Sequence, residues 1–273
     1  MLPRADIPID RRQVFRIGGL TVSFAALVAA CGEDRTGDTA PGRVGYAPPV
    51  TSPPDFDVND VVLLRTASSL EYSAIAVYEQ VLGLGVLDAE TTALVEELIG
   101  NHQDIADEMG ELTESAGGDA WECPNPWFME RLIEPVVALI VDSDDQVRDV
   151  FNTAVSLENL AASTHQSLAV QLTEPDAKLA TMAAAVLESR HSAALVVRVR
   201  GAEGYISPGI DGEDVPPDES GIPQRFAVTG RFGTVGQAEL TVGAADENGA
   251  RETFLLQTPA ENSFVYSELE PTC

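Results

Sequence analysis

Apolar residues recur at helical spacing through four long segments of the chain. The segments run from about Asp57 to Leu84, from about Ala89 to Ser115, from about Asp144 to Leu172 and from Pro175 to Gly201. The connections within the first pair and within the second pair are short, so the paired helices are expected to run antiparallel. The pattern therefore predicts an antiparallel four-helix bundle, which we place at residues 56–204.

A shorter apolar segment, WFMERLIEPVVALIV at residues 127–141, lies between the two pairs. Pro135 has no amide hydrogen and crowds the preceding turn, so we expect this helix to bend or break there.

The end of the chain has a different pattern, in which apolar and polar residues alternate. Four such runs lie within residues 225–273, at 225–233, 237–245, 251–257 and 263–269, and DENG at 246–249 supplies a turn. We expect a small antiparallel sheet of three or four strands behind an acidic, proline-rich linker at 205–224. The tail contains no histidine, so we expect it to pack or to bind another cell-envelope protein.

Residues 1–30 have the pattern of an export signal. Arg11 and Arg12 precede a moderately apolar stretch that is too short to span a bilayer stably, which resembles a twin-arginine signal. The sequence LVAAC resembles a lipobox, in which Cys31 is lipidated. An ordinary secretory signal with an incidental cysteine is the alternative. We expect residues 31–55, rich in Gly, Pro, Asp and Thr, to tether the protein to the outer face of the cytoplasmic membrane.

The chain is strongly acidic, with 16 Lys and Arg against 44 Asp and Glu. Without residues 1–30 the balance is 12 against 42, a net charge of −30. Such a charge repels nucleic acid, so we expect no nucleic-acid partner.

Two cysteines remain besides Cys31. Cys123 and Cys273 form an even pair in an oxidising compartment, so we expect a disulfide that ties the tail to the bundle. Two free thiols are the alternative, because spacing alone does not establish proximity.

A short repeat points to chemistry inside the bundle. SLEYSAIAVYEQ at residues 69–80 and SLENLAASTHQS at 156–167 place Glu71 and Glu158 among apolar and small residues. A carboxylate in such surroundings is costly unless it is paired or coordinated. In the fourth helix, Glu188 and His191 are three residues apart and can reach one centre. All three histidines of the chain, His102, His165 and His191, lie in different long helices.

This order of residues resembles the ferritin-like carboxylate bundles, here an exported, lipid-anchored bacterial member. That family takes a Glu from each of two helices and a Glu-x-x-His pair from each of the other two. The resemblance covers roughly residues 57–201 and implies a metal site formed by Glu71, His102, Glu158, Glu188 and His191. It implies iron, with a di-iron centre as one form, or manganese, and redox chemistry with oxygen, peroxide or the metal itself.

The second helix departs from the family pattern. Ile99 and Ile105 flank His102 at the positions three residues away, so a complete Glu-x-x-His pair is missing. Glu97, Asp104 and Glu108 are candidates for compensation, although helical geometry places none of them cleanly beside His102.

Tyr78 and His165 each follow the glutamate of their own helix by seven residues, or about 10 Å along the axis. We therefore expect both to lie near the site but outside the ligand set.

A second function stays open, in which the bundle has lost its metal and serves as a structural or partner-binding lipoprotein. A storage shell is a third option, which the lipid anchor and the appended sheet disfavour. The sequence predicts neither the substrate nor the oligomeric state.

Overall fold

A computed structural model describes residues 57–206, 236–258, 263–271 and 273, all within one compact unit, Pro41–Cys273. The expectations for the export signal, the lipidated cysteine, the tether and most of the acidic linker lie outside the described residues.

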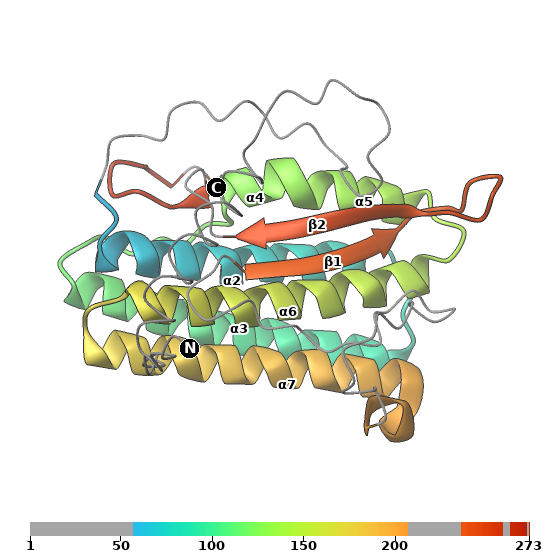
Figure 1. Cartoon of the computed structure of the whole chain (residues 1–273), viewed down its shortest axis with the longest axis horizontal. Helices are drawn as coiled ribbons and strands as arrows, with labels where there is room; N and C mark the ends of the chain where they lie inside the picture. Colours follow the sequence, from blue (N-terminus) through green and yellow to red (C-terminus); the bar gives the residue numbers. More distant parts are fainter. Residues whose placement is uncertain (1–56, 207–235, 259–262, 272) are drawn as a thin grey trace, which may run out of the picture. The chain divides into compact units, whose positions relative to one another are not determined.

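Four long helices form the body of this unit: α2 (Asp60–Gly83), α3 (Ala89–Ser115), α6 (Gln146–Gln171) and α7 (Pro175–Ile206). Figure 1 shows that α2 and α7 run in one direction and that α3 and α6 run in the other. The helices of each pair contact each other, and the two pairs are joined by contacts of α2 with α6 and of α3 with α7. The expected mainly α fold, an antiparallel four-helix bundle with a small β appendage, is confirmed.

Side chains at the start of three helices define where they begin. Asn59, Asp88 and Asp145 each accept a hydrogen bond from a backbone amide in the first turn of α2, α3 and α6. The end of α7 differs from the prediction, because the helix continues through Gly201 to Ile206. A glycine inside a helix costs only about 1 kcal/mol relative to alanine, which the flanking helix-forming residues can offset.

The crossover between the two helix pairs is itself helical. It contains α4 (Pro126–Phe128), a π-helical turn (Met129–Ile133) and α5 (Glu134–Val141). The predicted interruption is confirmed, since the wide π turn comes directly before the turn that contains Pro135. The proline ring would otherwise crowd the carbonyl of Arg131, four residues earlier.

The appendage is a two-stranded antiparallel hairpin of β1 (Gly236–Val242) and β2 (Glu252–Thr258), with Leu240 opposite Phe254. It is anchored on α6, where Asn152 Nδ2 donates to Thr241 O at 2.9 Å. Asp149 Oδ2 also accepts from the amide of Gly243 at 2.7 Å.

The prediction of a strand at 263–269 is wrong. This segment binds side chains of α2 instead of pairing with a neighbouring strand. The amide of Val265 donates to Thr66 Oγ1 at 2.9 Å, and the carbonyl of Leu269 accepts from Arg65 at 2.7 Å. The expected strand at 225–233 lies outside the described residues.

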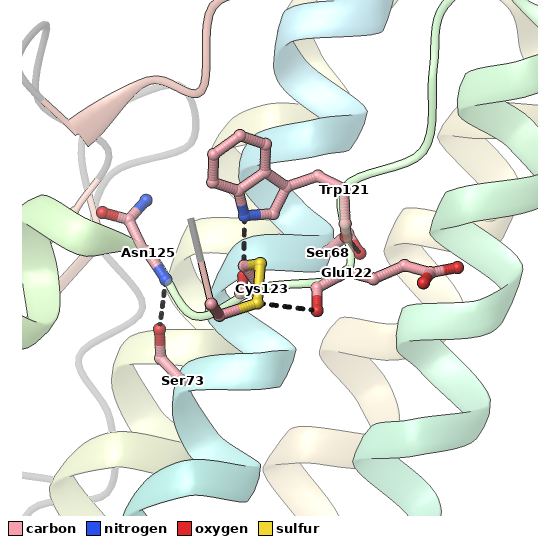
Figure 2. The surroundings of a disulfide bond; sticks show 7 residues. Ser68, Ser73, Trp121, Glu122, Cys123 and Asn125 are labelled. Atoms are coloured by element: carbon pink, nitrogen blue, oxygen red, sulfur yellow. Dashed lines mark hydrogen bonds between the residues drawn. A yellow bond between two sulfur atoms is a disulfide. The ribbon is translucent and has the colours of Figure 1, made fainter. Parts of the chain in front are cut away.

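A disulfide joins Cys123, in the loop after α3, to Cys273, whose Cα atom is 5.7 Å away. Figure 2 shows this loop against α2. Ser68 Oγ donates to the carbonyl of Trp121 at 2.7 Å, and the amide of Asn125 donates to Ser73 Oγ at 2.9 Å. The polar outer side of α2 therefore holds both the loop and the C-terminal segment.

None of the described helices is long and apolar enough to cross a membrane.

Candidate metal centre

The middle of the bundle contains six buried side chains with metal-binding chemistry. Their exposed fraction is 4% for His191 and 0% for the other five. They are Glu71 on α2, His102 on α3, Glu158 and His165 on α6, and Glu188 and His191 on α7. The structure thus brings together all five ligands expected from the sequence and adds His165 to them.

Small neighbours leave room for these groups. Ala74 on α2 and Ala161 and Ala162 on α6 are buried next to the two repeated glutamates in the sequence. Small residues at a helix interface allow the backbones to approach, so side chains from four helices can meet. The repeat Ser-Leu-Glu followed by small residues therefore marks the two helices whose glutamates point inward.

The first cluster contains His102, Glu158, Glu188 and His191, whose donor atoms lie within 4.8 Å of one another. His102 Nε2 is 3.2 Å from Glu158 Oε1, and its Nδ1 is 3.4 Å from Glu188 Oε1. His191 Nδ1 is 3.1 Å from Glu158 Oε2 and 3.7 Å from Glu188 Oε2. Two imidazoles and two carboxylates thus face a common centre.

The second cluster contains Glu71, His165 and Glu188, which meet the same distance criterion of 4.8 Å. His165 Nε2 is 2.6 Å from Glu71 Oε1, and the other carboxylate oxygen of Glu71 is 2.8 Å from His102 Nδ1. Glu188 belongs to both clusters. One carboxylate therefore lies between two adjacent sets of donors.

Glu188 is the member whose buried oxygens have no hydrogen-bond partner among the described residues. A fully buried carboxyl group without a hydrogen bond is costly, and a bound cation would remove that cost. Mixed carboxylate and imidazole donors suit iron and manganese. The residues present therefore fit the metal site that the sequence implies.

Burial and neighbouring charges give the three carboxyl groups different pKa values. Burial alone raises the pKa of Glu71, but contacts with His165 and His102 outweigh it and lower the pKa to about 2. Burial raises the pKa of Glu158, but the charge of His102 and hydrogen bonds with Glu188, His102 and His191 together hold it well below its ordinary value. Burial raises the pKa of Glu188 to about 8, assisted by the charges of Glu71 and Glu158. Without a metal, Glu188 is therefore the carboxyl group that keeps a proton at neutral pH.

The imidazoles are shifted in the direction that favours their charged form. Burial lowers the pKa of His191, but the hydrogen bond that it donates to Glu158 and the proximity of Glu188 raise it to about 9. The pKa of His102 is raised well above its ordinary value by Glu188 and Glu158 despite burial, and that of His165 is raised by Glu71. Metal binding must therefore displace protons from the imidazoles and from Glu188.

Tyr78 and His165 lie near the site, as expected, but the expected separation of about 10 Å from the ligands is wrong. The hydroxyl of Tyr78 donates to Glu158 Oε1, and His165 contacts Glu71. The distance was counted along one helix, whereas each side chain meets the glutamate of the other, antiparallel helix (Figure 1). Tyr78 of α2 reaches Glu158 of α6, and His165 of α6 reaches Glu71 of α2. The contact is thus reciprocal, as the repeat would require.

The proposed substitutes on the second helix do not fill its missing position. Glu97, Asp104 and Glu108 are exposed, and Ile99 packs against the hydrophobic core. His165 on α6 supplies the additional donor instead.

One further residue near the cluster was missed in the sequence. Asn101 Nδ2 lies 3.2 Å from His191 Nε2, the ring nitrogen opposite the one that faces Glu158. Because Nε2 carries a hydrogen when Nδ1 faces a metal, the carboxamide of Asn101 would turn its oxygen toward this nitrogen and fix the ring orientation. Its position directly before His102 was the only signal in the sequence.

Comparison with known protein families matched residues 59–199 to the family described as ferritin-like domain. The match covers just over half of the 273 residues and includes every member of the two clusters. Neither the curated proteins nor the solved structures gave a match.

Proposed function

We propose that this chain, which belongs to the ferritin-like domain family, binds two iron or manganese ions inside its bundle. We also propose that it is exported and anchored to the membrane. The observation that carries the proposal is the position of Glu188 in both clusters. A carboxylate has two oxygens and can be shared between two cations. Two adjacent donor sets with one shared carboxylate therefore support a two-metal centre.

Each ion would have its own donors besides Glu188. His102, Glu158 and His191 would hold one, and Glu71 and His165 would hold the other. The charges balance well, since three ionised carboxylates and three neutral imidazoles offset most of the charge of two divalent cations.

A bound pair of iron or manganese ions would supply one-electron redox chemistry toward oxygen, peroxide or a further metal ion. The protein side chains have other tasks. The hydroxyl of Tyr78 donates a hydrogen bond to Glu158 Oε1, and Asn101 orients His191. The six donor side chains are themselves at most 4% exposed, which limits the access of water to them.

Export and anchoring are part of the proposal and rest on the sequence. Arg11 and Arg12 before the apolar stretch support twin-arginine transport, and LVAAC supports lipidation of Cys31. The disulfide of Cys123 and Cys273 agrees with an oxidising compartment.

One observation favours a metal-free structural role as the second candidate. His102 lies between Glu71 and Glu158 with a ring nitrogen toward each, so protonated imidazoles can partly neutralise the carboxylates without a cation. In that case the hairpin and the acidic surface would bind a cell-envelope partner.

Metal analysis of the full chain, purified from cells competent for twin-arginine export, separates the two functions. We expect about two equivalents of iron or manganese per chain. Glu188→Gln keeps the size of the side chain but loses the charge and one ligand oxygen, so metal content should fall below half.

Glu97→Gln, an exposed substitution on α3, is the matched control and should retain the wild-type content. Absence of metal from the wild-type chain, also after incubation with Mn²⁺ or Fe²⁺, would support the structural function instead.

A further inference from the structure

The outer face of α7 carries apolar residues that no described part of the chain covers. Leu179, Val186 and Val197 are 72%, 53% and 38% exposed. They belong to a series that we call the outer seam: Leu179, Ala183, Val186, Arg190, Ala193 and Val197. Ala183 and Arg190 are also exposed, and Ala193 is half-buried.

The outer seam has the spacing of a helix–helix contact. Its members are separated alternately by four and three residues, the repeat that keeps side chains on one stripe of a helix. The opposite side of α7 contains Ala177, Ala184 and Leu195, which are buried in the bundle. Single exposed apolar residues are ordinary on protein surfaces, but a helix that is apolar on two opposite sides is expected to be covered on both.

The charge of this face differs from that of the whole chain, whose net charge is −28. Between Lys178 and Arg198 the only carboxyl group is that of Glu188, which is buried. Two such acidic chains repel each other at most orientations. Along the outer seam they can approach without bringing carboxylates together.

We propose that the outer seam is the contact through which two copies of this chain pair as a two-fold symmetric, antiparallel dimer. If the two-fold axis passes near residue 188, Leu179 lies opposite Val197 of the second copy and Ala183 lies opposite Ala193. Large residues then meet at the ends and next to the axis, and the two alanines meet between them. Such self-complementarity is what a two-fold interface requires.

Arg190 is the polar member of the outer seam. In this register it lies opposite Val186 of the second copy, where its aliphatic stem covers the valine and its guanidinium reaches solvent. The basic group also lies among two acidic chains, so its charge is favourable there.

A second copy fits the outer seam better than a lipid surface does. Helices that lie on membranes present bulky Trp, Phe or Leu residues and a polar face rich in Lys and Arg. The outer seam contains no aromatic residue, and its two alanines favour close approach of another helix. The seam spans about 27 Å at the helical rise per residue, a short contact that predicts a dissociation constant on the order of micromolar.

Sedimentation equilibrium of the full chain in detergent tests the proposal between about 1 and 100 μM, the range around that constant. We expect a dimer, and Ala183→Glu should weaken it at least about 100-fold, because two-fold symmetry places the new carboxylate against Ala193 of the other copy twice. Val170→Glu on α6 is the matched control, since Val170 is 43% exposed and lies outside the seam; it should leave the dimer unchanged. Circular dichroism should show the same helical content in both variants.

The register has its own test. The double variant Ala183→Cys, Ala193→Cys should form disulfide-linked dimers on oxidation, whereas Ala183→Cys alone should not. Higher salt should strengthen the dimer, because it screens the repulsion between acidic chains.

A monomer throughout the concentration range would overturn the proposal. So would a dimer that Ala183→Glu leaves intact. Binding of the monomer to vesicles of phosphatidylglycerol through the same residues would assign the seam to lipid instead.

Discussion

His165 Nε2 lies 2.6 Å from Glu71 Oε1, although the two residues belong to α6 and α2 and are 94 positions apart. The pair supplies two of the three members of the second cluster. His165 supplies a donor in place of the carboxylate that α3 lacks at Ile99. Two donor sets, rather than one incomplete set, therefore surround Glu188.

His165→Asn removes the imidazole from the second cluster and leaves the first cluster complete. We expect metal content to fall from about two equivalents to about one, because Glu71 and Glu188 alone make a poor site. Metal analysis of the purified chain measures this. Gln103→Asn, a half-buried polar substitution on α3 outside both clusters, is the control and should keep both ions. Unchanged metal content in His165→Asn would exclude the residue as a ligand.

The stability of the metal-free protein should decrease as the pH rises from about 6.5 to about 9. The folded-state pKa of His191 is raised from 6.5 to about 9, and that of Glu188 from 4.5 to about 8. A raised pKa contributes stability that is present below the unfolded-state value and is lost as the pH passes through the folded-state value. Both groups therefore act in the same direction over this range.

Urea unfolding of chelator-treated protein at several pH values measures that dependence. His191→Gln should flatten the curve. In the metal-loaded protein the same protons are already displaced, so the decrease should be much smaller. A metal-free protein that becomes more stable between pH 6.5 and 9 would contradict these assignments.

Cys273→Ser should lower the free energy of unfolding by about 2–4 kcal/mol, because the disulfide restricts the unfolded chain. The bond closes a long loop, since 150 residues separate Cys273 from Cys123. Dithiothreitol should lower the stability of the wild-type chain by a similar amount and should not affect Cys273→Ser further. Equal stability of all four samples would mean that the two thiols are free.

Asp149→Ala should release the hairpin from α6 without removing metal. Asp149 is buried and accepts hydrogen bonds from the amide of Gly243, from Arg148 Nε at 2.8 Å and from Ser143 Oγ, so its loss removes the acceptor of three donors. We expect a loss of about 1–3 kcal/mol. Hydrogen exchange should become faster in β1 and β2, while metal content stays at the wild-type value. Loss of metal in this variant would link the hairpin to the site.

Helical periodicity was sufficient to predict the bundle, since the four long helices begin within three residues of their predicted starts. Local signals carry that information: Asn59, Asp88 and Asp145 cap three helices, and Pro175 begins the fourth. The crossover was predictable for the same reason, because the effect of Pro135 on a helix is local.

The contacts of Tyr78 and His165 were not predictable in this way. They depend on how far one antiparallel helix is shifted along another, and spacing within one helix does not contain that shift. The prediction of a strand at 263–269 failed for a related reason. Its alternation is typical of a strand, but its backbone groups bind Thr66 and Arg65 of a helix that is about 200 residues away.

The most direct test of the two-metal centre is electron paramagnetic resonance of the full chain loaded with Mn²⁺. If Glu188 is shared by two ions, the wild-type chain should show the signal of a magnetically coupled pair. Glu188→Gln should show only the signal of isolated Mn²⁺ or none. A wild-type spectrum of isolated Mn²⁺ at saturation, or no bound Mn²⁺ at all, would contradict the account.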